Sequence, residues 1–246
     1  MSETIAPPTT SASSESDMST PETLTGIFFE PSRTYEALRA RPRFLVAGLI
    51  LLVLAVLVTV ILYTRVDMGQ YMRERIQSSP NAAQLSEEQI EMQVKIGKNF
   101  GMAAIPVSVP IIIAAGAALY LLGVMLFGGS ITYRKALSVW VYSSLPPSVI
   151  GALLAILVLF IKSPDSIDPE HMVVTNPGAL FGEDASKVLV AILTQFDLLR
   201  FYGMFLAALG LRKVGKLSSG SAWGIVILMW AAGALVRIAS AVIFGR

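Results

Sequence analysis

The chain has 246 residues, of which 54% are hydrophobic and 15% charged, and its mean hydropathy is +0.66. This composition is typical of a polytopic membrane protein rather than of a soluble domain. The formal net charge is only +2, so the electrostatic basis for nucleic-acid binding is missing. The chain has no cysteine, which excludes disulfides, thiol nucleophiles and cysteine-ligated metals.

The first 25 residues are rich in Ser, Thr, Pro and Glu and contain almost no large apolar side chain. Such a segment buries too little apolar surface to offset the entropy of ordering, so residues 1–25 are predicted to form a disordered cytoplasmic tail. They also lack the basic start and short apolar stretch of a signal peptide. The first hydrophobic segment is therefore expected to serve as an uncleaved anchor.

A short amphipathic helix is expected within residues 26–43, on the cytoplasmic leaflet ahead of the first hydrophobic segment. Ser32 is a suitable N-cap, and Tyr35 and Leu38 are three residues apart, so they share one helix face. Two interpretations stay open: a docking surface for a partner or lipid, and a stop that positions the first span. The docking residues would be Phe28, Phe29, Pro31, Arg33, Tyr35 and Leu38.

Five segments are long and apolar enough to cross about 30 Å of hydrocarbon, which takes roughly 20 residues. They cover residues 44–63, 102–127, 140–161, 188–211 and 223–244. In the third segment, Pro146 and Pro147 remove backbone donors, so this segment is expected to kink or begin afresh there, and a short, tilted or re-entrant span is one outcome. The sequence therefore predicts an all-α fold, with residues 44–246 forming a bundle of five transmembrane helices.

Basic residues in the short loops predict the orientation, because cytoplasmic flanks retain positive charge. They gather before the first segment, between the second and third, and between the fourth and fifth, whereas the longer loops on the other side are richer in acidic residues. We therefore expect a cytoplasmic N-terminus and an external C-terminus. The basic residues are Arg33, Arg39, Arg41, Arg43, Arg134, Lys135, Arg212, Lys213 and Lys216.

Asp197, Arg200 and Arg237 lie inside the last two predicted spans. A charge at the bilayer centre costs roughly 2.5–3.5 kcal/mol on insertion scales, so these residues mark a specialised place. In a hairpin about Leu217, Asp197 and Arg237 lie at similar depth because both are 20 residues from its centre. Arg200 follows one helical turn after Asp197 on nearly the same face, so one carboxylate could bridge both guanidinium groups.

Three interpretations of these charges are open. The simplest is an ion pair that fixes the register of the last two helices. In the second, Arg200 and Arg237 bind a lipid phosphate or a carboxylate of a partner protein. In the third, Asp197 relays protons or cations in a small transporter. Transport is disfavoured because the chain shows no evident internal repeat and few further polar residues in its other spans.

Catalytic, cofactor-binding and metal-binding residues are not predicted. His171 is the only histidine, so a zinc site or a Ser-His dyad has little basis. The acidic residues near it could hold a divalent cation loosely, but a solvated acidic loop is the preferred interpretation. These residues are Asp168, Glu170, Glu183 and Asp184. We expect a non-enzymatic protein without a cofactor.

Three sequence motifs carry a family resemblance. The first is Ile27-Phe28-Phe29-Glu30-Pro31-Ser32-Arg33-Thr34-Tyr35 with the basic flank and long span that follow it. The second is Tyr142-Ser143-Ser144-Leu145-Pro146. The third is Phe196-Asp197-Leu198-Leu199-Arg200-Phe201-Tyr202, which continues to Gly210-Leu211 and Lys216-Leu217-Ser218. Together they resemble bacterial members of the Ypt-interacting protein (Yip) family over about residues 25–246.

The resemblance implies a five-span protein of the bacterial inner membrane that organises membranes or scaffolds partners, since eukaryotic relatives act in vesicle traffic with small GTPases. Here Phe28-Phe29-Glu30-Pro31 stands in place of the eukaryotic Asp-Leu-Tyr-Gly-Pro element, so small-GTPase binding is not expected. The expected partners are the bilayer itself, a membrane or cytoplasmic protein, and an anionic lipid, but no nucleic acid. The alternative function is a small transporter that uses Asp197.

Overall fold

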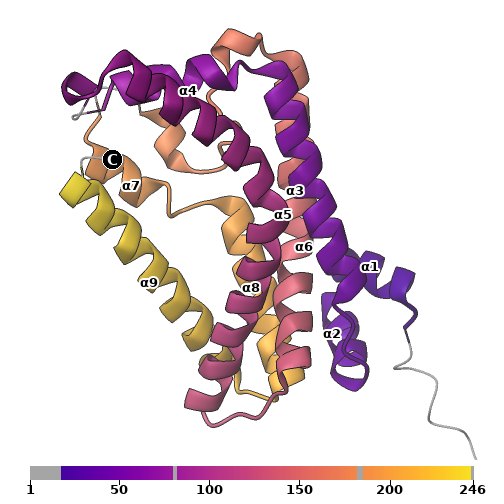
Figure 1. Ribbon diagram of the computed structural model, residues 1–246. Coiled ribbons are helices and arrows are strands. Elements are labelled where there is room, and N and C mark those ends of the chain that lie inside the picture. Colours follow the sequence, from indigo (N-terminus) through magenta and orange to yellow (C-terminus); the bar gives the residue numbers. More distant parts are fainter. Residues whose placement is uncertain (1–17, 80–81, 182–184, 245–246) are drawn as a thin grey trace, which may run out of the picture.

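The computed structural model describes residues 18–79, 82–181 and 185–244. All regular structure in these ranges is helical, as the sequence predicts (Figure 1). The α-helices are α1 (Thr20–Phe29), α2 (Pro31–Ala40), α3 (Leu45–Arg65), α4 (Met68–Gln77), α5 (Glu87–Leu126), α6 (Tyr133–Ile161), α7 (Lys187–Leu193), α8 (Leu198–Gly215) and α9 (Ser219–Phe244). Short 3-10 helices are η1 (Ala82–Gln84), η2 (Pro164–Ser166) and η3 (Pro177–Leu180).

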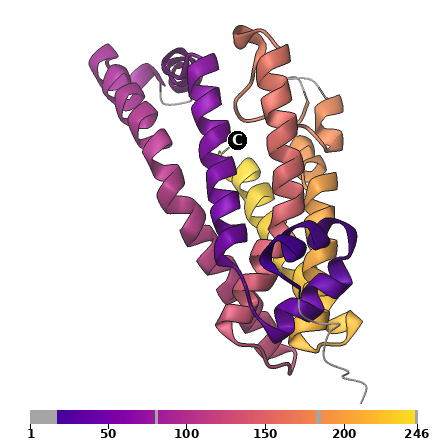
Figure 2. The ribbon, with the colours of Figure 1, turned by 90° about the vertical axis from the view of Figure 1, so that its right-hand side faces the viewer.

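The structure confirms five helical stretches that are long and apolar enough to span a membrane. They are Leu45–Arg65, Glu87–Leu126, Tyr133–Ile161, Val188–Gly215 and Ser219–Ile243, of which the fourth combines α7 and α8. Helix α6 is central, because it contacts α3, α5 and α8 (Figures 1 and 2). Helices α1 and α2 lie toward the end of the bundle that holds the loops at 127–132 and 216–218, whereas α4, α7 and the last turn of α9 lie at the other end (Figure 1).

Helix α5 begins outside the apolar span. Ser86 and Gln89 form a capping box, with the Ser86 Oγ accepting from the Gln89 N–H at 3.2 Å and the Gln89 side chain accepting from the Ser86 N–H at 2.8 Å. From there the helix continues for 40 residues, or about 60 Å at 1.5 Å per residue. Its first part therefore extends well beyond the hydrocarbon, where α4 packs against it.

Helix α6 runs without interruption from Tyr133 to Ile161 through Pro146 and Pro147. The predicted fresh start at these prolines is wrong. Proline lacks an N–H, so the carbonyls of Tyr142 and Ser143 lose their helical donors. Helix α8 packs closely over this point, since a Cβ on Gly203 would lie 3.5 Å from the Ser143 carbonyl oxygen and from the Pro147 ring. Packing of neighbouring helices is what makes proline tolerable inside a span.

Part of the segment predicted as a disordered tail is helical. Residues 20–25 belong to α1, while residues 1–17 lie outside the described residues. Ser19 caps α1 in a capping box, because its N–H donates to Glu22 Oε2 at 2.6 Å and its hydroxyl accepts from the Glu22 N–H at 3.4 Å. The hydroxyl groups of Thr23 and Tyr142 are hydrogen-bonded at 2.9 Å in the buried interior. Tertiary contacts thus offset the conformational entropy lost when residues 20–25 become ordered, although these residues bury little apolar surface of their own.

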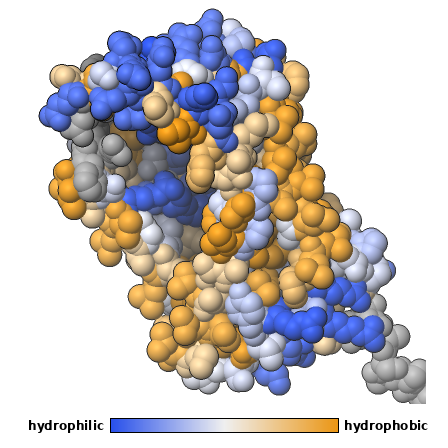
Figure 3. Space-filling model, in the orientation of Figure 1, coloured by the Kyte–Doolittle hydropathy of each residue, from blue (hydrophilic) through white to orange (hydrophobic). Residues whose placement is uncertain are grey.

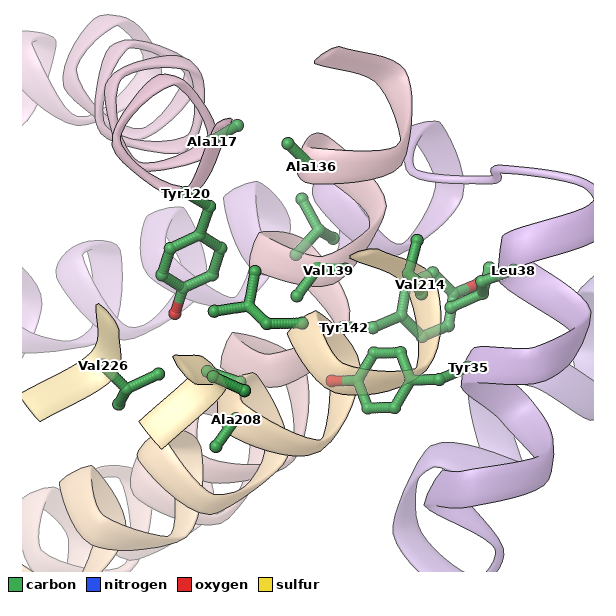
Figure 4. Close-up of a cluster of buried hydrophobic side chains, with 14 of the residues drawn as sticks. Tyr35, Leu38, Ala117, Tyr120, Ala136, Val139, Tyr142, Ala208, Val214 and Val226 are labelled. Carbon is green, nitrogen blue, oxygen red and sulfur yellow. The ribbon is translucent and has the colours of Figure 1, made fainter. Parts of the chain in front are cut away.

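The short helix expected within residues 26–43 is present as α2, but a second helix that was not predicted, α1, precedes it, and the two meet at Glu30, as the restriction on residues before proline favours. Glu30, not Ser32, occupies the N-cap position of α2. The Tyr35 and Leu38 side chains are both 0% exposed and join the main hydrophobic core (Figure 4). Helix α2 therefore packs against α8 and α6 as part of the bundle, and these side chains are not available to lipid.

Small residues allow the helices of this core to approach closely. A Cβ on Gly210 of α8 would lie only 2.8 Å from the Tyr35 ring and from Val139 of α6. Similarly, a Cβ on Gly116 of α5 would lie 2.2 Å from the Trp140 ring. The glycine Cα atoms therefore occupy places where a larger residue would separate the helices.

Candidate functional site

The fourth span, predicted as one helix over residues 188–211, is broken. Helix α7 ends at Leu193 and α8 begins at Leu198, so residues 194–197 cross the interior without helical structure (Figure 1). The physical reason lies in the residue types at the break. Thr and Asp side chains offer the backbone alternative hydrogen bonds, and Asp is among the best N-caps. Hydropathy alone does not register such a break.

Asp197 is the N-cap of α8. Its Oδ1 accepts from the Arg200 N–H at 2.9 Å, and its Oδ2 accepts from the Thr175 hydroxyl at 2.5 Å. The carbonyl of Thr175 in turn accepts from the Leu198 N–H at 3.1 Å. The connection between α6 and α7 therefore reaches down to the break and satisfies part of its backbone.

Gln195 satisfies other polar groups of the break. This side chain is only 2% exposed, and its Nε2 donates to the Ala191 carbonyl of α7 at 2.8 Å. Its Oε1 accepts from the Arg200 guanidinium at 2.8 Å, and the Trp230 indole N–H of α9 donates to its backbone carbonyl at 3.3 Å. Backbone polar groups at membrane depth need such internal partners, so this network lets the helix break persist.

Three aromatic rings cover the break on the side of α9. The centroids of Phe196, Phe201 and Trp230 are 6.0–6.3 Å apart in all three pairs. These separations fall in the range of favourable tilted and edge-to-face contacts. The rings join the break, α8 and α9 in one packed cluster.

The predicted pairing of Asp197 with Arg237 is not present, since no ion pair joins them within the described residues. The break directs the Asp197 carboxylate to the first turn of α8 and to Thr175 instead. Arg200 lies within electrostatic range of both Asp197 and Arg237. The structure thus places Arg200 between the other two charged residues in its electrostatic interactions, and the Asp197 carboxylate is already hydrogen-bonded.

A cavity of about 350 Å³ lies beside Arg200, between α5, α6 and α8. Figure 3 shows a hollow on the face between α5 and α9, with hydrophilic residues inside it and mostly hydrophobic residues below it. The sequence did not predict this cavity, although Ser144 and Ser148 are spaced to share a helix face. The cavity is lined by Tyr120, Ser143, Ser144, Pro147, Ser148, Leu199, Arg200, Gly203 and Met204.

The structure divides the predicted docking residues into two groups. Phe29 is 85% exposed, and Arg33 is also exposed and pairs with Glu30 at 3.0 Å. Phe28 and Pro31 are half-buried. Tyr35 and Leu38 are fully buried and cannot contact a partner unless α2 detaches.

The acidic loop around His171 forms no metal-binding group of three or more His, Asp or Glu in the described part of the chain. The His171 ring Nδ1 lies 2.6 Å from the Asp168 carboxylate, both at the surface. Glu183 and Asp184 fall outside the described residues.

Comparison with known proteins connects this architecture to a family. The family model of the Yip1 domain matches residues 25–240. The membrane protein YknW of Bacillus subtilis is 28% identical over 207 residues, which cover 84% of each chain. No solved structure matches the chain significantly. Since the family model spans α1 to α9, including the broken span, the chain belongs to the Yip1 domain family.

Proposed function

We propose that this protein is a non-enzymatic member of its family that organises the bacterial inner membrane or scaffolds partner proteins, with its N-terminus in the cytoplasm. The contact surface is the exposed side of α1 and α2, centred on Phe29 and Arg33. The observation that carries the proposal is that a firmly anchored helix pair presents an aromatic side chain that is 85% exposed.

The anchoring of this surface is extensive. The Tyr35 and Leu38 side chains of α2 are buried in the bundle. In addition, Lys213 Nζ of α8 lies 2.5 Å from Glu36 Oε1 of α2. A surface that is already ordered loses little conformational entropy when a partner binds. Aromatic and arginine side chains are also the types that most often dominate binding energy at protein interfaces.

Point substitutions test this surface without removing the core. Deletion of residues 26–40 would also remove buried Tyr35 and Leu38, so Phe29→Ala and Arg33→Ala are the sharper changes. Crosslinking in native membrane followed by mass spectrometry should show a protein adduct that both changes weaken. Leu180→Ala, at a residue 84% exposed near the other end, is the matched control. Identical adducts in all four proteins would contradict the proposal.

The broken fourth span favours a small transporter as a second candidate function. Discontinuous helices at membrane depth often form substrate and ion sites in transporters. Asp197→Asn is a clean test, because asparagine keeps the N-cap and removes the charge. Purified protein in vesicles would be tested for proton flux with an internal pH dye. Flux that disappears in Asp197→Asn would replace the scaffold proposal, whereas wild-type vesicles without flux would exclude the proton pathway.

A further inference from the structure

We propose that the cavity between α5, α6 and α8 is a binding site for a phosphate group, presented by a phospholipid from the surrounding bilayer. Arg200 is the residue that contacts the phosphate directly, and the Ser148 hydroxyl of α6 is a second donor at the cavity wall. The site is separate from the α1–α2 surface and does not depend on the function proposed for it.

The net charge of the residues near the cavity favours an anionic ligand. Arg200 and Arg237 lie within electrostatic range of one another, and no carboxylate forms an ion pair with either of them in the described ranges. Asp197 is the nearby anion, but it caps α8 and accepts from Thr175. Asp197, Arg200 and Arg237 together carry one formal positive charge within the last two candidate spans, where an uncompensated charge is costly. A phosphodiester carries one negative charge and would neutralise it.

The wall of the cavity offers hydrogen-bond donors that suit phosphate oxygens. Arg200 uses one guanidinium nitrogen for the Gln195 amide oxygen, and a guanidinium carries five N–H groups in all. Arg200 lines the cavity, and Ser148 of α6 lines it as well, whereas the hydroxyl of neighbouring Ser144 donates to the Trp140 carbonyl at 2.9 Å. Guanidinium and hydroxyl groups are the usual donors to phosphate oxygens. The amide contact also orients the arginine without neutralising it.

The apolar surroundings of the cavity favour a lipid over free phosphate. Pro147, Leu199 and Met204 share the lining with the polar groups, and the lining comes from membrane-spanning segments of all three helices. A volume of about 350 Å³ is at the lower end for small-molecule sites, so it suits a headgroup whose acyl chains stay in the bilayer. Free phosphate would have to leave water to reach the same place.

The test measures binding of a soluble short-chain phosphatidylglycerol to the full-length protein, purified in a phosphate-free detergent, by native mass spectrometry. Arg200→Gln should weaken binding by about tenfold or more, because a charge-assisted hydrogen bond contributes roughly that factor. Arg212→Gln is the matched control, since Arg212 is an exposed arginine at the other end of α8, and it should bind as the wild type does. Equal binding by Arg200→Gln and wild type would overturn the proposal.

A second pair of measurements identifies the source of the phosphate. Inorganic phosphate at millimolar concentration should leave the bound phosphatidylglycerol in place. Displacement of the lipid by inorganic phosphate would overturn the lipid assignment in favour of a free anion. Short-chain diacylglycerol, which lacks the phosphate, should not bind, and binding equal to that of phosphatidylglycerol would show that the cavity recognises acyl chains and not phosphate.

Ser148→Phe keeps the proposal testable if Arg200→Gln does not fold. Ser148 is exposed at the cavity, so a phenyl ring can occupy the cavity without displacing buried side chains. We expect Ser148→Phe to lose phosphatidylglycerol binding while its thermal unfolding temperature stays within a few degrees of wild type. Retained binding in a folded Ser148→Phe protein would place the lipid elsewhere and refute the site.

Discussion

Two regions of the bundle are stabilised in different ways. One is the end that contains α1 and α2, and the other surrounds the break between α7 and α8. At the first, close packing of apolar side chains and glycines buries Tyr35, Leu38 and Tyr142 almost completely. At the second, a network of hydrogen bonds compensates for a missing stretch of helix, and a cavity remains open beside Arg200. Close apolar packing and polar hydrogen bonding are therefore concentrated in different parts of one small membrane protein.

The largest effect should come from Tyr35→Ala, because it empties a fully buried position between α2 and α8. We expect the free energy of unfolding of the detergent-solubilised protein to fall by about 3–5 kcal/mol, as for large aromatic residues in other cores. Chemical denaturation followed by fluorescence measures the change. Phe29→Ala on the adjacent helix should alter it by less than about 0.5 kcal/mol, since Phe29 is exposed. Equal losses would mean that α2 is not part of the core.

A smaller loss is expected for Gly210→Ala, which adds one methyl group to the same interface. That Cβ would lie 2.8 Å from the ring of fully buried Tyr35 and from Val139, so these neighbours would have to shift. Overpacking of this kind costs about 1–3 kcal/mol. A Cβ on Gly233 of α9 would have no atom within 4 Å, so Gly233→Ala is the control and should not lower stability. If Gly210→Ala is as stable as Gly233→Ala, the helices at Gly210 are not packed as closely as the structure indicates.

At the break, Asp197→Ala should cost about 0.5–2 kcal/mol through loss of the N-cap of α8. The effect is local, so amide hydrogen exchange in the first turn of α8 is the appropriate measurement. Asp197→Asn keeps an acceptor for the Arg200 N–H and should preserve protection there. If Asp197→Ala instead leaves exchange unchanged, the break does not depend on this cap.

The smallest expected effect concerns pH at the start of α1. The hydrogen bond from the Ser19 N–H lowers the pKa of Glu22 below its ordinary value of 4.5. A depressed pKa means that the carboxylate stabilises α1 above about pH 4.5 and that this contribution is lost as pH falls through the lowered value. Amide exchange in residues 20–24 should therefore rise, beyond the intrinsic pH dependence, as the pH is lowered below 4.5. Glu22→Gln should show no such step, because its amide does not titrate in this range.

For the candidate site, the sequence identified Asp197, Arg200 and Arg237 because charges within apolar segments are visible without coordinates. It did not identify Thr175 or Gln195, which are ordinary polar residues whose partners come from other parts of the fold. The break itself was missed because hydropathy averaged over about 20 residues treats 188–211 as one segment. The pattern of Thr194, Gln195 and Asp197 ahead of Arg200 is the local signal that could have revealed it.

Composition and segment length alone determined that the chain has five spans and an all-α membrane domain, because each span must satisfy its own backbone in hydrocarbon. Tertiary structure decided the rest. It buried the face of α2 that carries Tyr35 and Leu38, and it carried α6 through two prolines. It also opened the fourth span at Asp197. In each case a neighbouring element supplies the contacts or hydrogen bonds that offset a local cost, and a local sequence pattern cannot specify which neighbour that will be.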